Sequence, residues 1–329
     1  MKTFANANAR TLQEAARRSQ QARTAGQHAV FAGGGTDVLQ LVKDRIVQPD
    51  VIVNLKTIPN LNQVTKSAAG VSIGGQITLD ALSKNDIIRK GYPVLAEAAA
   101  SVATPQIRNV GTIAGNVAQR PWCWYYRNAF PCYKNGGNQC FSFAGENQFH
   151  AIFGGGPSYI VHPSDTAPAL VALGAMFRIV GPSGERRVAA SDFFVLPRQN
   201  AAAENVLADD EVLASIELPA TTAASRSHYF KVMDRETWTH AVVSAAVVLE
   251  MDGSTCRSAR VVLGGVAPVP WRLQNVEQVL TGQRVTEDLA ARAAETAVIG
   301  ARALSKNAYK IPMTKGVVRR TVLQVAQMA

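Results

Sequence analysis

Three consecutive glycines, Gly33, Gly34 and Gly35, stand with Thr36 and Asp37 between a predicted strand at 28–32 and a short predicted helix. Glycine tolerates positive φ and lets other groups approach the backbone closely, so successive N–H groups in such a turn can point at one anion. The run lacks the lysine of a P-loop and the spacing of a G-x-G-x-x-G motif. It therefore predicts an anion-binding turn that belongs to neither of these nucleotide-binding classes.

A second loop of the same character covers residues 111–116, where small residues, a hydroxyl and an amide accompany backbone donors. Either loop by itself is more often an ordinary turn than a binding site. Together, in a chain with a net charge of +10, the two loops predict a clamp on the two phosphates of a dinucleotide.

The composition suits a soluble globular protein. A length of 329 residues fits about two domains, and an apolar content of 47% supplies a sizeable core. No apolar stretch approaches the ~20 residues of a membrane helix, which excludes a transmembrane protein. The basic residues are scattered singly and in pairs. This pattern disfavours nucleic-acid binding and better suits an anionic cofactor or an acidic partner.

The order of strand and helix patterns predicts an α+β chain of two domains, residues 1–220 and 225–329, around the linker-like segment 219–227. In the second domain, two apolar strands joined by a turn at 252–254 predict an antiparallel sheet, and helices follow it. The predicted strands are 50–55, 71–74, 160–161, 176–180, 211–218, 242–251 and 259–265, and the predicted helices are 11–22, 78–88, 95–102, 166–173, 286–304 and 315–328.

The segment 120–156 has no helix or strand periodicity and is rich in aromatic residues, glycine, asparagine and cysteine. So long an irregular segment is usually functional or disordered, and its aromatic residues argue against disorder. Cys123, Cys132 and Cys140 have the spacing C-x8-C-x7-C, which matches no common zinc or ferredoxin signature. Spacing alone therefore favours a site without a cluster, and the distant Cys256 is best explained as a buried residue.

The tetrapeptide His162-Pro163-Ser164-Asp165 follows a predicted strand and opens a predicted helix. Ser164 or Asp165 can cap that helix. The same short polar groups can also hydrogen-bond the ribityl chain or the ring edge of a ligand. The residues alone leave both interpretations open.

Several motifs resemble the FAD-binding medium subunit of molybdenum hydroxylases, the family of xanthine dehydrogenase, aldehyde oxidoreductase and carbon monoxide dehydrogenase. The resemblance spans essentially the whole chain and includes Lys231 and Arg235. Its motifs are AGGGTD at 32–37, IRNVGTIAGN at 107–116, HPSD at 162–165, GGVAPVP at 264–270 and NAYKIP at 307–312.

The resemblance implies a fold with a two-lobed FAD-binding domain, followed by a carboxy-terminal antiparallel sheet with helices. It also implies a heterotrimer: a large subunit with molybdopterin, a small subunit with two [2Fe–2S] clusters, and this subunit with FAD, which passes electrons to an external acceptor. The pyrophosphate is expected at 32–36 and 112–116, and Ser164, Asp165 and Lys231 near the ribityl chain or the isoalloxazine. The implied FAD-binding residues are Ala32, Gly33, Gly34, Gly35, Thr36, Asp37, Thr104, Ile107, Gly111, Thr112, Ala114, Gly115, Asn116, Ser164, Asp165 and Lys231.

Residues 120–158 resemble the insert of the periplasmic aldehyde oxidoreductase and 4-hydroxybenzoyl-CoA reductase branches, which implies an additional [4Fe–4S] cluster on Cys123, Cys132 and Cys140. Where that branch has a fourth cysteine, this chain has Ser158. Ser158 could ligate through its oxygen, His150 or His162 could complete the site, or the cluster could be incomplete.

Two other functions stay open: a stand-alone flavoprotein oxidoreductase acting directly on a small substrate, and a basic nucleic-acid-binding protein with a zinc-like cysteine loop. Neither a catalytic base nor a histidine for covalent flavin attachment stands out.

No apolar segment follows the arginines near the amino terminus, so no export signal is expected. The expected compartment is the cytoplasm, or the periplasm by co-export with a partner subunit that carries a twin-arginine signal.

Overall fold

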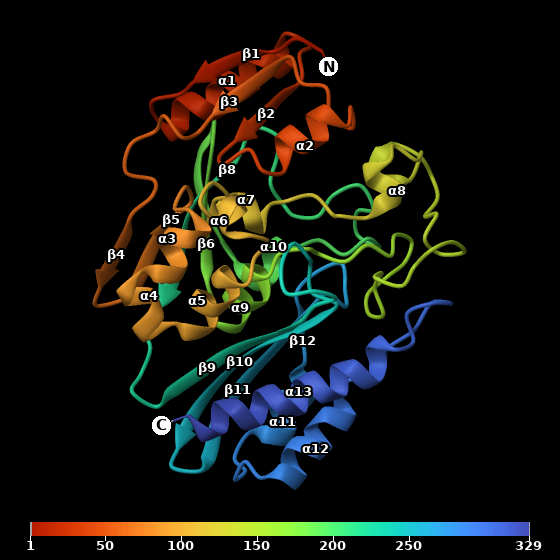
Figure 1. The fold of residues 1–329 in the computed structure, drawn as a ribbon. Helices are drawn as coiled ribbons and strands as arrows, with labels where there is room; N and C mark the ends of the chain where they lie inside the picture. Colours follow the sequence, from red (N-terminus) through yellow and green to blue (C-terminus); the bar gives the residue numbers. More distant parts are fainter. Residues whose placement is uncertain (1, 329) are drawn as a thin grey trace.

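A small parallel sheet stands at the amino-terminal end of the computed structural model, which describes residues 2–328 (Figure 1). Its strand order is β1-β3-β2, with helices α1 and α2 as the crossovers that parallel pairing requires. Thr11 caps α1, the helix predicted to start at residue 11: its hydroxyl accepts from the Glu14 N–H at 3.0 Å. The elements are β1 (Ala5–Asn8), α1 (Leu12–Thr24), β2 (Ala29–Ala32), α2 (Val38–Lys43) and β3 (Val51–Asn54).

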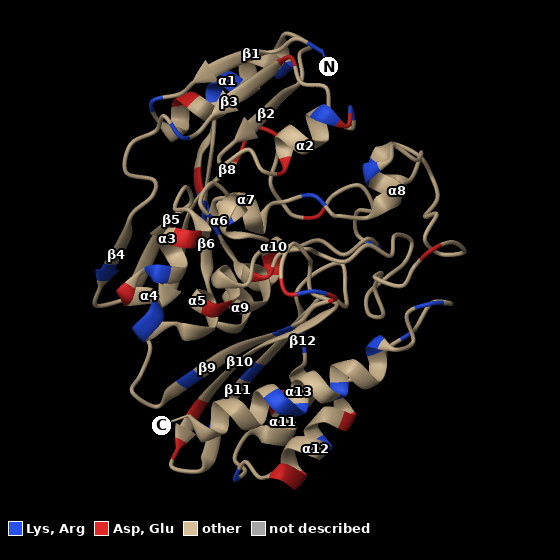
Figure 2. Cartoon of the chain, viewed as in Figure 1, with Lys and Arg blue, Asp and Glu red and all other residues tan. Residues whose placement is uncertain are grey.

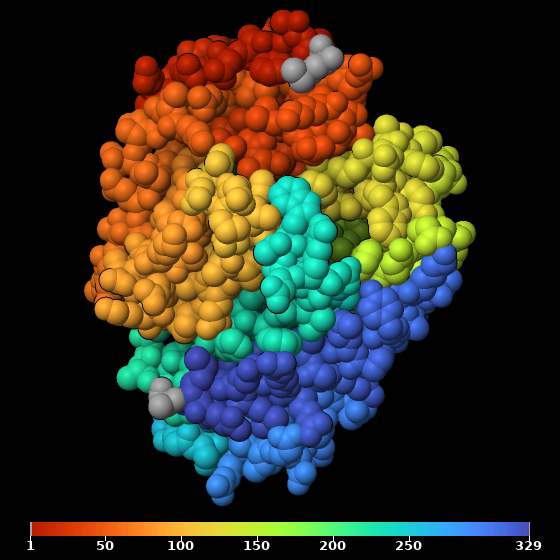
Figure 3. Space-filling model, viewed as in Figure 1, coloured from red at the N-terminus to blue at the C-terminus, as the bar shows by residue number. Residues whose placement is uncertain are grey.

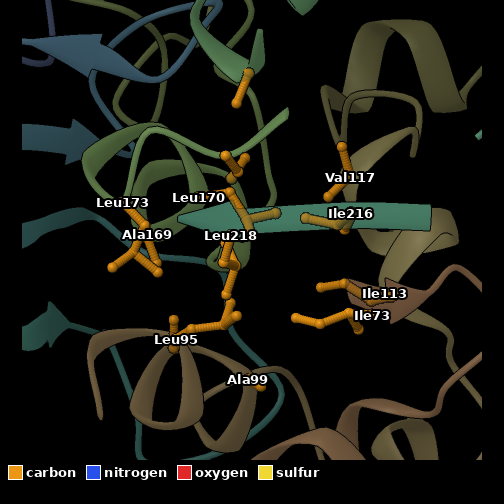
Figure 4. Packing of buried hydrophobic residues seen from close by; sticks show 14 of the residues in the cluster. Ile73, Leu95, Ala99, Ile113, Val117, Ala169, Leu170, Leu173, Ile216 and Leu218 are labelled. Carbon is orange, nitrogen blue, oxygen red and sulfur yellow. The ribbon is translucent and has the colours of Figure 1, made fainter. Parts of the chain in front are cut away.

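A five-stranded antiparallel sheet of order β4-β5-β8-β6-β7 forms the middle of the molecule. Figure 4 shows helix side chains such as Leu95, Ile113 and Leu170 gathered around Ile216 and Leu218 of strand β8, and all five residues are buried. The strands are β4 (Val64–Ser67), β5 (Gly70–Gly74), β6 (Met176–Gly181), β7 (Gly184–Ala189) and β8 (Val212–Pro219). The helices are α3 (Leu79–Lys84), α4 (Asp86–Gly91), α5 (Pro93–Ala100), α6 (Pro105–Arg108), α7 (Ile113–Val117), α9 (Thr166–Ala172) and α10 (Ala190–Phe193).

The carboxy-terminal sheet is antiparallel, with the order β12-β11-β10-β9. Helices α5 and α9 contact it from one side and α11 and α13 from the other. Because both of its faces are covered, β10 is a nearly continuous apolar run rather than an alternating one. The elements are β9 (Ser225–Val232), β10 (Val243–Asp252), β11 (Thr255–Gly264), β12 (Trp271–Arg272), α11 (Gln274–Leu280), α12 (Glu287–Thr296) and α13 (Lys310–Gln327).

Residues 120–158, here named the cysteine insert, form an irregular lobe beside the two sheets. They contain only the helix α8 (Trp124–Arg127) and one 3-10 turn (Tyr133–Asn135) as regular helices. Figure 3 shows this lobe, yellow to green, against the amino-terminal part above and the blue carboxy-terminal segment below. The lower contact is built from hydrogen bonds: Asn307 Nδ2 donates to the His150 carbonyl (3.0 Å), and the buried Lys310 Nζ donates to the Phe149 carbonyl (2.8 Å).

The α+β class and the antiparallel carboxy-terminal sheet with helices are confirmed. The strand predicted at 160–161 is wrong, because this segment is irregular and its His162 N–H donates to the Ala267 carbonyl. The predicted helix 78–88 is divided at Asn85, whose side chain caps α4. The helix predicted to reach residue 304 ends at Thr296, shortly before Gly300 with φ +82°.

The segment predicted as a linker, 219–227, is in part a strand, because β9 begins at Ser225. Lys and Arg residues are scattered over the cartoon in Figure 2 and are interspersed with Asp and Glu. None of the helices within residues 2–328 is long and apolar enough to cross a membrane.

Candidate functional site

The two glycine-rich loops lie against each other beyond the carboxyl end of β2. A Cβ added to Gly34 would lie 2.1 Å from the Val110 carbonyl oxygen, and one added to Gly33 would lie 2.9 Å from the Thr112 hydroxyl. Gly35 has a φ of +75°, a conformation that favours glycine. The three glycines are therefore required both for the turn and for the approach of the second loop.

A cavity of about 420 Å³ opens beside these loops and is named here the glycine-loop cavity. Of the predicted residues, its lining includes Gly33, Gly34, Gly35, Thr36, Asp37, Thr112, Ala114 and Gly115. Among the lining residues that sequence reasoning missed are the polar Gln76 and Arg120. The Gln76 Oε1 atom is buried and finds no hydrogen-bond donor within residues 2–328. A buried acceptor of this kind suits a ligand that brings its own donor, so the cradle fits a dinucleotide such as FAD.

Other predicted residues shape the second loop from behind. Thr112 is buried, and its hydroxyl caps α7 by accepting from the Gly115 N–H at 3.2 Å. Thr104 caps α6 by accepting from the Ile107 N–H at 3.4 Å, and the Ile107 carbonyl in turn accepts from the Gly111 N–H at 2.6 Å. These groups fix the backbone course of 104–115, which places Ala114 and Gly115 at the cavity.

Ser164 and Asn116 belong to a buried hydrogen-bond network away from the glycine-loop cavity. Asn116 Oδ1 accepts from the hydroxyls of Ser164 (2.6 Å) and Thr166 (2.7 Å). The Ser164 hydroxyl also accepts from the Ala167 N–H at 3.0 Å, in the first turn of α9. The structure thus shows the capping role of Ser164.

Asp165 and Lys231 meet as a buried ion pair between α9 and β9. Lys231 Nζ lies 2.7 Å from Asp165 Oδ2, and both side chains are at most 4% exposed. The ammonium also donates to the Ser101 carbonyl (3.0 Å), and the Tyr229 hydroxyl donates to Asp165 Oδ1 (2.7 Å). Burial, reinforced by the Asp165 charge, raises the pKa of Tyr229 well above its usual value, which keeps this hydroxyl a neutral donor. Asn116, Ser164, Asp165, Thr166, Tyr229 and Lys231 are together named the Asp165 cluster.

The Asp37 carboxylate is occupied by groups of the cysteine insert. Arg127 Nη2 donates to Asp37 Oδ1 at 2.6 Å, and the Arg120 N–H donates to Oδ2 at 2.9 Å. These partners lie 90 and 83 residues further along the chain, so no local sequence signal points to them.

The three cysteines of the insert are neighbours with different surroundings. Cys123 Sγ lies 3.4 Å from His150 Nε2, Cys140 Sγ lies 3.1 Å from the Ser142 hydroxyl, and Cys132 is buried. Burial raises the pKa of Cys123 to about 11, and the charges of Cys140 and Cys132 push it in the same direction.

Burial, with the nearby Lys310 charge, lowers the pKa of His150 to about 4, so its ring is neutral and can bind a metal. Ser158 is buried in the insert, whereas His162 packs against Phe194. Among the described residues, no three Cys, His, Asp or Glu side chains are arranged to hold a metal ion. The insert therefore fits an iron–sulfur cluster only in part: it carries three thiols in one lobe, but they form no coordination shell in the part of the chain that the structure describes.

Comparisons with known proteins place the whole chain in one family. Residues 2–221 match the FAD binding domain in molybdopterin dehydrogenase, and residues 228–325 match the CO dehydrogenase flavoprotein C-terminal domain. The chain is 32% identical to the aldehyde oxidoreductase FAD-binding subunit PaoB of Escherichia coli strain K12, over 96% of each protein. It is 28% identical to the carbon monoxide dehydrogenase medium chain of Hydrogenophaga pseudoflava, over 83% of this chain and 79% of that one.

A solved structure agrees with this assignment. It is the carbon monoxide dehydrogenase of Hydrogenophaga pseudoflava that lacks the Mo-pyranopterin moiety of the molybdenum cofactor. The match has a TM-score of 0.77 at 26% identity and covers 98% of this chain and 96% of that one. The chain therefore belongs to the family of FAD-binding subunits of molybdenum hydroxylases, and its relatives are subunits of dehydrogenases and oxidoreductases.

Proposed function

We propose that this chain binds FAD in the glycine-loop cavity and serves as an electron-transfer subunit of a molybdenum hydroxylase. The observation that carries the proposal is the meeting of two glycine-rich loops at one cavity with an unpaired buried acceptor, Gln76 Oε1. In this proposal the backbone at Gly33, Gly34, Gly35, Thr36, Ala114 and Gly115 holds the pyrophosphate. Ala32, Asp37, Thr104, Ile107, Gly111, Thr112 and Asn116 support these loops, and the Asp165 cluster fixes the far end of the site.

Bound FAD supplies chemistry that takes up electrons singly and releases them in pairs. The chain's own contribution is to hold and orient that cofactor. The names of the relatives, an FAD-binding subunit and medium chains, support a heterotrimer. In that assembly a molybdopterin-bearing large subunit oxidises an aldehyde or an N-heterocycle such as a purine. A [2Fe–2S] small subunit delivers the electrons, and an external acceptor removes them.

Cofactor analysis and co-purification test this function. The purified chain should release about one FAD on denaturation, and a tagged chain expressed with its natural gene neighbours should retain a molybdenum and an iron–sulfur subunit. A chain without FAD would contradict the proposal. A flavin-loaded chain that oxidises a small substrate without partners would instead establish the stand-alone flavoprotein.

We also propose that Cys123, Cys132 and Cys140 hold an additional [4Fe–4S] cluster, as in the aldehyde oxidoreductase branch. The presence of the three thiols in one insert supports this, and Ser158 and His150 are the candidates for the fourth ligand. Complex prepared without oxygen should contain about eight iron per heterotrimer, four in the two [2Fe–2S] clusters of the small subunit and four in this chain. Cys132→Ser should lower the content to about four iron and spare the flavin, whereas Cys256→Ser, in β11, should change neither. About four iron per heterotrimer in the wild-type complex would rule the additional cluster out.

Two organisational proposals remain. We propose a domain division near residue 220, and the adjoining family matches at 2–221 and 228–325 support it. Limited proteolysis should then cut first at 219–227.

For the compartment we propose the cytoplasm, or the periplasm through co-export with a signal-bearing partner. Cell fractionation with and without that partner tests this.

A further inference from the structure

The contact between Asp37 and the cysteine insert is a partly buried, multiply bonded ion pair. The Asp37 side chain is 21% exposed and that of Arg127 is 7% exposed. Arg127 also donates to the Pro121 carbonyl at 2.9 Å, and its guanidinium lies 4.3 Å from the centre of the Trp122 ring. A charged pair with several shielded bonds holds two segments together far better than an exposed salt bridge does.

Apolar packing joins the same two segments. Leu41 lies on α2, the helix that starts directly after Asp37, and it forms a buried cluster with Tyr126 and Cys132 of the insert. The glycine loop, α2 and the insert are thus linked by a charged contact at one end of the helix and an apolar contact along it.

The insert also contributes to the glycine-loop cavity. Arg120, its first residue, lines the cavity, and its Nε lies 2.9 Å from Glu204. Glu204 is 4% exposed and is also paired with Lys134 of the insert at 2.7 Å. Because the Arg120 N–H bonds to Asp37, the position of this wall residue depends on the Asp37 carboxylate.

We propose that Asp37 is a positioning residue that fastens the cysteine insert onto the glycine loop, and that the fastened insert increases the affinity of the cavity for FAD. This inference rests on the proposed function. Coupling between two sites is reciprocal, so bound FAD should in turn keep the insert closed.

The test compares Asp37→Asn, Arg127→Met and the double variant in the full chain. Each single variant should raise the dissociation constant of FAD about ten-fold, since each breaks the same shielded charged contact. The double variant should also raise the dissociation constant of FAD about ten-fold rather than a hundred-fold, because the two residues act through one contact. Asp44→Asn, at the exposed far end of α2, is the matched control and should bind FAD like the wild type.

Tryptic cleavage within the insert, after Arg127 or Lys134, gives a readout that a general loss of stability would not reproduce. Saturating FAD should slow this cleavage in the wild type and much less in Asp37→Asn, while cleavage elsewhere stays unchanged. If Asp37→Asn weakens FAD binding and Arg127→Met does not, Asp37 contacts the cofactor directly and the proposal is wrong. It is also wrong if both single variants bind FAD like the wild type. A wild-type chain that binds no FAD would overturn the proposed function. The rate of tryptic cleavage within the insert, compared between the wild type and Asp37→Asn without FAD, would still test whether Asp37 fastens the insert.

Discussion

The glycine-loop cavity and the Asp165 cluster differ in how their polar groups are satisfied. In the cavity, the backbone of two loops is accessible and Gln76 Oε1 has no donor within residues 2–328. In the cluster, Asp165 receives bonds from Lys231 and Tyr229, and Asn116 receives them from two hydroxyls. In this comparison, the accessible loop backbone and the unpaired Gln76 Oε1 mark a surface for a ligand, whereas the paired groups of the Asp165 cluster form a framework that positions it.

The largest expected effect is on the framework. Lys231→Met leaves the Asp165 carboxylate buried without its cation, and this should lower the free energy of unfolding by about 3–5 kcal/mol. Urea denaturation monitored by circular dichroism measures the change. Lys84→Met removes an exposed pair with Asp80 and should change stability by at most ~0.5 kcal/mol. Equal effects of the two substitutions would show that the Asp165 cluster is not a framework element.

A methyl group at the loop contact should act on the ligand surface. Gly34→Ala places a Cβ 2.1 Å from the Val110 carbonyl oxygen, so the two loops must separate. Such overpacking costs about 1–3 kcal/mol, and we expect FAD affinity to fall roughly 10- to 100-fold. Gly316→Ala is the matched control: it lies within α13, has no atom within 4 Å of the added Cβ, and should stabilise the chain by up to about 1 kcal/mol. Titration with FAD, followed by tryptophan or flavin fluorescence, measures the affinity. A Gly34→Ala variant that binds FAD as tightly as the wild type would contradict the expectation.

The HPSD segment at 162–165, which leads into the Asp165 cluster, should also be sensitive to acid. Burial lowers the pKa of His162 from 6.5 to about 3, so between these values the unfolded chain binds a proton that the folded chain does not. The contribution to stability is therefore complete above pH 6.5 and declines as the pH falls, by up to about 1.4 kcal/mol per pH unit. Unfolding curves near neutral and near pH 5 should differ less for His162→Leu than for the wild type. The exposed His28→Leu should retain the wild-type difference.

The smallest expected effect concerns the unpaired acceptor. Gln76→Leu removes no hydrogen bond that Oε1 accepts from residues 2–328, so stability should change by less than about 1 kcal/mol. If the ligand donates to this oxygen, FAD affinity should fall about five- to ten-fold. Thermal unfolding and FAD titration measure the two quantities. If the variant loses stability but keeps its FAD affinity, Gln76 supports the fold and does not contact the ligand.

The sequence predicted the features that depend on local residue type. Runs of glycine identified Gly33–Gly35 and the 111–116 loop, Thr11 identified the start of α1, and the apolar run of β10 identified a buried strand. It could not predict contacts made by distant polar residues. Arg127 reaches Asp37 across 90 residues, and Gln76 enters the cavity beside the glycine pair Gly74-Gly75, a signal too short to identify a ligand contact by itself. The irregular insert was recognised by its composition and by the absence of periodicity, but its course could not be predicted, because aromatic packing and side-chain bonds to the backbone, rather than a repeating pattern, determine it.

The bonds between the cysteine insert and the NAYKIP segment have a consequence for biosynthesis. Asn307 and Lys310 hold the backbone at His150 and Phe149 across 157 and 161 residues. A ribosome delivers the amino-terminal lobe long before these anchors emerge, and early regions of a nascent chain begin to fold first. The Phe149–His150 edge of the insert therefore gains these bonds only after residues 307–310 have been made, long after its own synthesis. Closure of this edge is in that sense a late step of a folding programme that begins in the amino-terminal lobe.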